Sequence, residues 1–129
     1  MTARPIVVMK FGGTSVAEAD GRAAIARRVL AALELGSAPV LVVSAMGRSG
    51  APYATDTLLS LVAGLPSDAR ELDLLASTGE AVSAVVLAHE LRSSGIDATA
   101  LSGPEAGVLT DGEHGGAAII EIHTGPLSA

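Results

Sequence analysis

Short apolar runs alternate along the chain with longer amphipathic segments. Residues 6–9 form a continuous apolar run between Pro5 and the pair Gly12-Gly13. An apolar run without alternation predicts a strand buried on both faces, as in a parallel sheet. Residues 20–35 then carry apolar side chains at four-residue spacing and end before Gly36, which predicts an amphipathic helix.

The same alternation continues to the middle of the chain. Residues 40–43, after Pro39, predict a second buried strand, so the chain opens as a strand–helix–strand unit, which is right-handed as a rule. After a loop over 45–54, a short helix is expected over 54–63 and a turn over 64–68, with Ser67 or Asp68 capping the next helix. That long helix is predicted over 71–93, with an irregularity at Gly79.

Two further strands complete the predicted pattern. Residues 97–101 predict a third strand, weakened by its alanines, and a fourth begins within 117–122. The alternation of strands and helices predicts an α/β fold with a mainly parallel sheet. About four strands make a small sheet for this class, so we expect a truncated domain.

Composition narrows the classes of function. The chain has 129 residues, enough for one domain, and its apolar share of 49% includes only two aromatic residues, Phe11 and Tyr53. The net charge of −6 disfavours a nucleic-acid partner, because such proteins present a basic face. An anionic ligand would need cations placed locally, and Lys10 is the only lysine.

Several kinds of site and location are disfavoured by what the sequence lacks. With no cysteine, disulfides, zinc–thiolate sites and thiol nucleophiles are excluded. His89, His114 and His123 do not have metal-ligand spacing, and a solvated turn explains His114 better than a metal site. The four-residue apolar run near the N-terminus is too short for a signal peptide, and we expect no membrane span. A soluble, cytoplasmic protein is predicted.

The first candidate motif is residues 10–15, Lys-Phe-Gly-Gly-Thr-Ser, where the first strand turns toward a helix. Ligands of open α/β sheets bind at the carboxyl ends of strands, and glycines let backbone N–H groups approach a phosphate. Lys10 would follow the charge that moves in phosphoryl transfer. The lysine precedes the glycines, so this is not a P-loop, and the adjacent Gly12-Gly13 pair does not match GxGxxG. The alternative is a strand-to-helix turn with a solvated lysine.

Two later segments carry further candidates. Ser44 ends the second strand at the same sheet edge, and Thr55 and Asp56 begin the next helix, where a carboxylate is favoured. The alternative for Thr55 or Asp56 is a helix N-cap. Glu80, beside Gly79, could accept hydrogen bonds from an α-ammonium group, and the alternative is a solvated helix residue.

Together, four ordered segments resemble the aspartokinases. They are residues 10–16 (Lys-Phe-Gly-Gly-Thr-Ser-Val), 42–47 (Val-Val-Ser-Ala-Met-Gly), 77–80 (Ser-Thr-Gly-Glu) and 107–111 (Gly-Val-Leu-Thr-Asp). The loop over 47–56 is similar to a monofunctional subgroup that includes diaminopimelate-sensitive forms. Four motifs in order, with proper gaps over nearly the whole chain, are far more specific than any one of them.

The resemblance implies a three-layer α/β/α amino-acid-kinase fold that transfers the γ-phosphoryl group of MgATP to the β-carboxylate of L-aspartate. The product, 4-phospho-L-aspartate, leads toward lysine and diaminopimelate, threonine and methionine. Carried over residue by residue, Lys10 would be catalytic, and Mg²⁺ would be held by the substrate phosphates. The phosphate side would be Lys10, Gly12, Gly13, Thr14 and Ser15, and the aspartate pocket Ser44, Thr55 and Glu80.

Departures from the family pattern indicate an N-terminal part of a catalytic domain over residues 1–129. The later Gly-Arg-Gly-Gly-Ser-Asp type segment, the nucleotide-binding lobe and the ACT domains do not occur in this sequence, and Ala81 stands where a polar residue is commoner. We therefore expect little activity from the isolated chain and a homo-oligomer in the full-length form. The alternatives are a sibling carboxylate kinase and a non-catalytic amino-acid-binding or assembly remnant.

Overall fold

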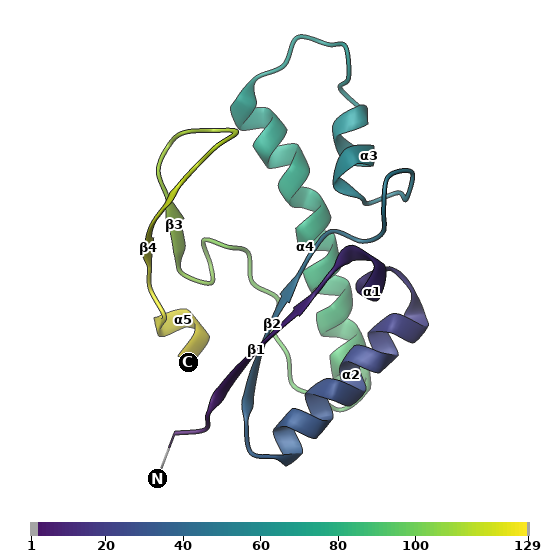
Figure 1. Ribbon diagram of the computed structural model, residues 1–129, viewed down its shortest axis with the longest axis vertical. Coiled ribbons are helices and arrows are strands. Elements are labelled where there is room, and N and C mark those ends of the chain that lie inside the picture. Colours follow the sequence, from purple (N-terminus) through teal and green to yellow (C-terminus); the bar gives the residue numbers. More distant parts are fainter. Residues whose placement is uncertain (1–2, 129) are drawn as a thin grey trace.

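The computed structural model describes residues 3–128 and opens with the predicted strand–helix–strand unit. Strand β1 (Ile6–Phe11) is followed by helices α1 (Gly13–Ala17) and α2 (Ala19–Glu34) and by strand β2 (Ala38–Val43). The strands are parallel, with Cα partners running from Ile6 and Ala38 to Phe11 and Val43 (Figure 1). Gly36 follows α2 with a φ of 79°, which turns the chain toward β2.

Two helices and a loop follow this unit. Helix α3 (Thr55–Ser60) is shorter than predicted, and α4 (Ala69–Ser93) spans 25 residues. The predicted cap at Asp68 is confirmed, because its Oδ1 accepts hydrogen bonds from the backbone N–H groups of Arg70 at 2.9 Å and Glu71 at 3.3 Å. The irregularity expected at Gly79 was wrong, since α4 runs through it as regular α-helix.

The last part of the described chain differs from the prediction. Strands β3 (Val108–Thr110) and β4 (Ile119–Ile122) form an antiparallel hairpin, and α5 (Gly125–Ser128) follows. Within residues 3–128 the sheets are therefore one parallel pair and one separate antiparallel pair, so the single, mainly parallel sheet was wrong for this part. The parallel crossover formed only where a helix of sufficient length joined two strands.

The third strand predicted over 97–101 was also wrong. This segment has no strand pairing in the structure. Its backbone is bound instead by a side chain, because Arg92 donates from a terminal guanidinium nitrogen to the carbonyl of Ala98 at 2.6 Å. Ala98 also packs against the core cluster, and alanine has a low preference for strands.

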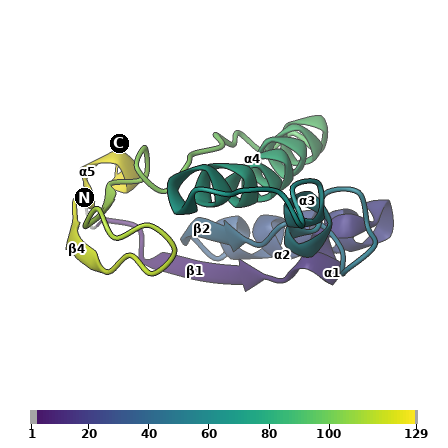
Figure 2. The same cartoon turned by 90° about the horizontal axis from the view of Figure 1, so that it is seen from above.

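The core lies between the parallel strands and the helices. Its buried members are Val16, Ile25, Ala26, Val29, Met46, Leu87, Leu91 and Ile96. Met9, Phe11, Leu41 and Val43 face this core from the strands, whereas Ile6, Val8 and Val42 on the other face are 59%, 65% and 47% exposed. Figure 2 shows α4 on one side of β1 and β2. The described residues thus form two layers, and the third layer of the expected fold is not among them.

Helix α4 contains an 18-residue stretch that is long and apolar enough to cross a membrane, judged by length and composition alone. This contradicts the expectation that no segment reaches that length. In the fold, however, Leu87 and Leu91 of α4 belong to the core, and the helix contacts α1, α2, α3 and β2. We therefore interpret α4 as the central helix of a folded domain.

Arg22 connects the short helix α1 to α2 and α4 through hydrogen bonds and an ion pair. Its terminal guanidinium nitrogen donates to the carbonyls of Val16 at 3.0 Å and Ala17 at 2.8 Å, which are otherwise unsatisfied at the end of α1. Its Nε lies 3.6 Å from Oε2 of Glu90 on α4. Because α1 begins at Gly13, this contact also fixes the turn that follows β1.

Candidate active-site cleft at the ends of the parallel strands

The carboxyl ends of β1 and β2 open onto a cleft of about 310 Å³. Four elements form it: the start of α1, the loop after β2, the start of α3 and the middle of α4. The lining residues are Gly13, Ser44, Ala45, Gly47, Arg48, Ser49, Ala54, Thr55, Asp56 and Glu80. The strand ends are the place where open α/β sheets bind ligands.

Backbone hydrogen bonds join the two loops that leave the strands. The N–H of Ser44 donates to the carbonyl of Phe11 at 3.2 Å, and the N–H of Gly47 donates to the carbonyl of Gly13 at 2.9 Å. The approach is so close that a Cβ on Gly13 would lie 2.6 Å from the carbonyl oxygen of Gly47 and would also overlap that of Ala45. Glycine is required at position 13 for this contact between loops.

A second close approach brings Glu80 to the cleft. Gly79 is buried, and a Cβ there would lie 2.8 Å from the carbonyl oxygen of Tyr53 and 2.9 Å from Cβ of Ala45. The missing side chain lets α4 press against the loop after β2 and the start of α3. Glu80, the next residue, is exposed at the cleft, and it forms no ion pair with any described residue.

The cleft brings together some of the predicted site residues. Gly13, Ser44, Thr55 and Glu80 line it, although they come from four different parts of the chain. Thr55 lies in the first turn of α3, whose N-cap is Ala54 and has no side-chain hydrogen bond. The alternative interpretation of Thr55 or Asp56 as an N-cap was therefore wrong.

The other predicted phosphate residues do not line the cleft: Lys10, Gly12, Thr14 and Ser15. Lys10 is the penultimate residue of β1, is exposed and pairs with Val42. Strand alternation places it on the open face of the sheet, opposite Met9 and Phe11. Gly12 precedes α1, and Thr14 and Ser15 are exposed residues of its first turn.

Sequence reasoning did not single out Arg48 or Ser49 as site residues, yet both line the cleft. Arg48 is the one cationic residue in its lining, and Asp56 and Glu80 are its two acidic residues. The motif with Ser44 and Gly47 ends immediately before Arg48, so the sequence did show that Arg48 is close to a predicted site residue. The direction of a loop side chain is set by tertiary contacts, however, which spacing does not report.

A second hollow, of about 350 Å³, lies between α3 and the first half of α4. Its lining is mostly apolar, with Leu59, Val62, Leu65 and Leu72 among its residues, and Asp73 is the one charged residue there. It lies away from the strand ends and lacks convergent polar groups, which small-molecule sites require for orientation. The smaller cleft is therefore the better candidate for chemistry.

Comparison with known proteins identifies the family of this chain. The amino acid kinase family profile matches residues 5–125. The chain belongs to the amino acid kinase family. It is 49% identical to aspartokinase 1 of Bacillus subtilis (strain 168) over 119 residues, which is 91% of this chain and 30% of that protein. It is 43% identical to the aspartokinase of Geobacillus stearothermophilus over 122 residues, with 92% and 28% covered.

A solved structure gives the same relationship. The chain resembles the crystal structure of aspartate kinase from Synechocystis with a TM-score of 0.67 and 40% identity, over 80% of this chain and 17% of that one. The resemblance to aspartokinases expected from the four motifs is thus confirmed. The chain spans about 30% of the length of these curated relatives.

Proposed function

We propose that this chain forms the acceptor-binding and phosphate-facing part of an aspartate kinase. The reaction is transfer of the γ-phosphoryl group of MgATP to the β-carboxylate of L-aspartate, with 4-phospho-L-aspartate and ADP as products. One observation carries the proposal: a cleft at the strand ends collects Ser44, Thr55 and Glu80 from three elements, in a chain similar to aspartokinases.

The cleft has the groups needed to hold an acidic amino acid. The hydroxyls of Ser44 and Thr55 donate to carboxylate oxygens, and the Glu80 carboxylate accepts hydrogen bonds from the α-ammonium group. Hydrogen bonds with an ionised partner are about twice as strong as neutral ones. Glu80 suits this role because no described residue is paired with it.

The phosphate side of the reaction is assigned to the turn between β1 and α1. Backbone N–H groups of Gly12 and Gly13 and the hydroxyls of Thr14 and Ser15 would face the phosphoryl group. Lys10 would stabilise its charge, because its four-carbon stem can carry the ammonium past the strand end. Positioning and electrostatics dominate such chemistry, so no covalent enzyme intermediate is invoked.

The remaining reaction partners follow from the same proposal. ATP is the phosphoryl donor, and Mg²⁺ is held by its phosphates and neutralises their charge. Most of the nucleotide site would come from sequence that this chain does not contain. The full-length protein would be a homo-oligomer and would act in the cytoplasm. The product would enter biosynthesis of lysine, diaminopimelate, threonine and methionine.

A coupled assay of ADP release with L-aspartate and MgATP tests the reaction. We expect turnover in a protein that supplies the remaining length of the relatives, and little or none in the 129-residue chain. A substrate panel with L-glutamate, N-acetylglutamate and uridylate separates aspartate kinase from its sibling carboxylate and nucleotide kinases. Turnover with one of those acceptors, and none with L-aspartate, would contradict the proposal.

Lys10→Ala tests the catalytic assignment in the active protein. Loss of one transition-state charge contact commonly lowers kcat by about 100-fold or more. We expect such a loss with unchanged thermal unfolding, because Lys10 is exposed and forms no ion pair with any described residue. Turnover like that of the unaltered protein would remove Lys10 from the mechanism and leave the acceptor cleft in place.

The groups that line the cleft also suit a second candidate, a non-catalytic amino-acid-binding module that pairs with a larger subunit. Calorimetry with L-aspartate and MgATP, each alone, distinguishes the two. An amino-acid-binding module binds aspartate and does not bind ATP, even after addition of the larger subunit. A kinase part gains ATP binding and turnover when the missing sequence is supplied.

A further inference from the structure

We propose that Arg48 is a specificity-determining residue, which contacts the β-carboxylate of the acceptor and makes the cleft prefer a carboxylate over an amide. The inference rests on the proposed function, in which the cleft takes L-aspartate. It goes beyond that function by assigning a residue that neither the motifs nor the resemblance singled out.

The charges that line the cleft require such a residue. Asp56 and Glu80 are acidic, and Arg48 is the one cation among the lining residues. L-Aspartate brings two carboxylates and one ammonium group. Glu80 can offset the ammonium, but the remaining carboxylates would meet Asp56 and the net charge of −6 without an opposing cation. Arg48 supplies that cation within the cleft.

The loop that carries Arg48 is fixed at both ends. On one side, the N–H of Gly47 donates to the carbonyl of Gly13 at 2.9 Å. On the other, the N–H of Gly50 donates to the hydroxyl of Thr57 at 3.0 Å, and that of Ala51 to the carbonyl of Arg48 at 2.8 Å. The backbone of Arg48 is therefore held in place before any ligand arrives, which lowers the entropy lost on binding.

The same bonds decide which end of the ligand Arg48 meets. Arg48 follows the residue bonded to Gly13, so it lies next to the turn assigned to phosphate. Glu80 enters the cleft from α4, a different element. An amino acid whose ammonium is held by Glu80 and whose acceptor group faces the phosphate side presents its β-carboxylate to Arg48.

The guanidinium of Arg48 is also free to bind, unlike those of Arg22 and Arg92. Arg22 donates to two carbonyls and faces Glu90, and Arg92 donates to the carbonyl of Ala98. Among residues 3–128, no carboxylate forms an ion pair with Arg48. A planar guanidinium with uncommitted donors matches the two oxygens of a carboxylate and gains less from an amide.

The test compares L-aspartate with L-asparagine, which differs only in carrying an amide at the acceptor position. Dissociation constants come from NMR or calorimetric titration of the whole 129-residue chain. We expect the unaltered chain to prefer aspartate by at least about ten-fold. Arg48→Gln should bring the ratio to about one, and Arg48→Lys should give an intermediate ratio, since an ammonium is a point charge without the planar fork.

Arg70→Gln is the matched control, because Arg70 is exposed on the first turn of α4 and does not line the cleft. It should keep the original ratio. An Arg48→Gln chain that still prefers aspartate by the original factor would overturn the inference and leave the proposed function standing. An unaltered chain that binds neither ligand would overturn both. A ratio is insensitive to a general loss of folded protein, and thermal unfolding of each variant checks this.

Discussion

The two halves of the described molecule are held together in different ways. From β1 to α4, side chains of strands and helices share one buried cluster that reaches Ile96. Beyond Ile96, Gly107 is the one buried residue up to position 128, and all four residues of β4 are exposed. The candidate cleft belongs entirely to the half with the core. Packed elements therefore position the site, and the hairpin is not needed to form it.

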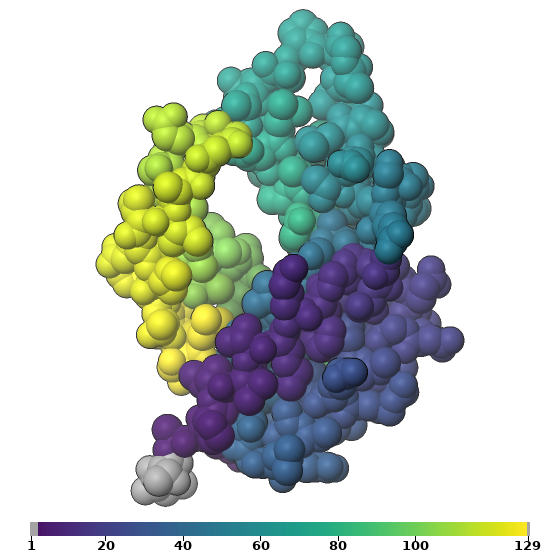
Figure 3. Space-filling model, in the orientation of Figure 1, coloured from purple at the N-terminus to yellow at the C-terminus, as the bar shows by residue number. Residues whose placement is uncertain are grey.

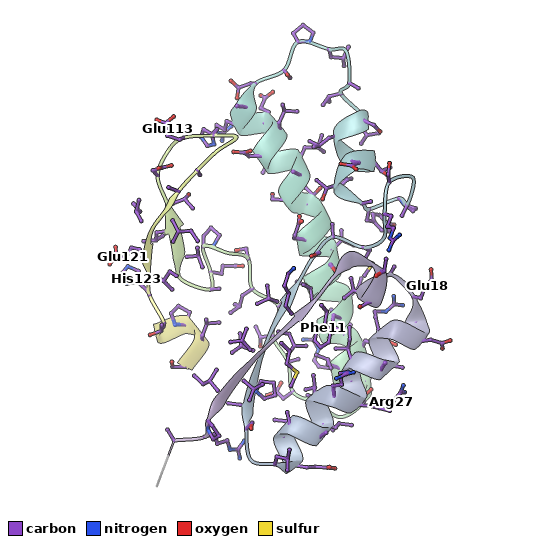
Figure 4. All side chains as sticks on the ribbon, viewed as in Figure 1. Phe11, Glu18, Arg27, Glu113, Glu121 and His123 are labelled. Carbon is purple, nitrogen blue, oxygen red and sulfur yellow. The ribbon has the colours of Figure 1, made fainter. Side chains whose placement is uncertain are left out.

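Hydrogen bonds close the hairpin at its base and join its tip to α4. At its base, the N–H of His123 donates to the carbonyl of Gly107 at 2.8 Å. At its tip, Oδ2 of Asp73 on α4 accepts from the N–H of Gly115 at 2.9 Å and lies 3.3 Å from Nδ1 of His114. Figure 3 shows an opening between the hairpin and the rest of the chain. In Figure 4, Glu121 and His123 lie on its outer side, and Glu113 lies near its tip.

The largest expected difference between the halves is in the response to truncation of an apolar side chain. Leu87→Ala should lower the free energy of unfolding by about 2–5 kcal/mol, because Leu87 is buried in the core. Ile120→Ala should change it by less than about 0.5 kcal/mol, since Ile120 is 67% exposed. Urea unfolding followed by circular dichroism measures both. Equal losses would show that the halves are not distinct.

The next effect tests the close packing that brings Glu80 to the cleft. Alanine normally stabilises a helix interior over glycine by about 1 kcal/mol. At Gly79 the sign should reverse, with a loss of about 1–3 kcal/mol, because the new Cβ would press on the carbonyl oxygen of Tyr53 and on Ala45.

Gly116→Ala is the control for this substitution, since a Cβ there meets nothing within 4 Å. Its effect on the free energy of unfolding should stay within about 0.5 kcal/mol. If Gly79→Ala also proved neutral or stabilising in urea unfolding, the tight contact between α4 and the loop after β2 would be contradicted.

A smaller, local effect is expected at the hairpin tip. Asp73→Ala removes the acceptor of the Gly115 N–H, and one such bond contributes about 1 kcal/mol. Amide hydrogen exchange in β3 and β4 should therefore quicken about five-fold, while amides of α4 near Leu87 keep their rates. Asp97→Ala, at an exposed position, serves as control. Equal exchange in the two variants would mean that Asp73 does not anchor the hairpin.

The smallest effect concerns a single exposed carboxylate before the hairpin. The backbone N–H and hydroxyl of Ser102 both donate to Glu105, at 2.8 and 2.7 Å, and they lower the pKa of Glu105 below its usual value of 4.5. Because the pKa is lowered in the fold, the ionised carboxylate stabilises the turn at pH values above its usual pKa. This stabilisation is lost as the pH falls through the lowered pKa. Ser102→Ala should raise the pKa of Glu105, as an NMR titration would show. No rise would remove the hydroxyl as a cause.

The first half of the fold was predictable because its signals are local. The apolar runs of the two parallel strands, the four-residue spacing of α2 and the side chain of Asp68 each act within a few residues. The hairpin was not predictable in this way, because a strand forms only when another strand pairs with it. Residues 97–101 found none, and Ile119 to Ile122 paired back onto Val108 to Thr110.

The site was predictable to a similar degree. Ser44 and Glu80 lie in motifs, Thr55 lies in the loop over 47–56, and the resemblance suggested that the three share a pocket. Their meeting, however, depends on contacts at Gly13 and Gly79 that only the fold provides. Arg48 was missed for the same reason. Lys10 stood out by composition, and the structure places it outside the cleft lining, on the open face of the sheet.

Titration of ¹⁵N-labelled chain with L-aspartate tests the central claim most directly. The account predicts that the largest amide shift changes occur at Ser44, Thr55 and Glu80, and that Glu80→Gln greatly reduces them. Changes that gather instead around Leu65 and Leu72, in the apolar hollow between α3 and α4, would contradict it. So would a spectrum that L-aspartate leaves unaltered.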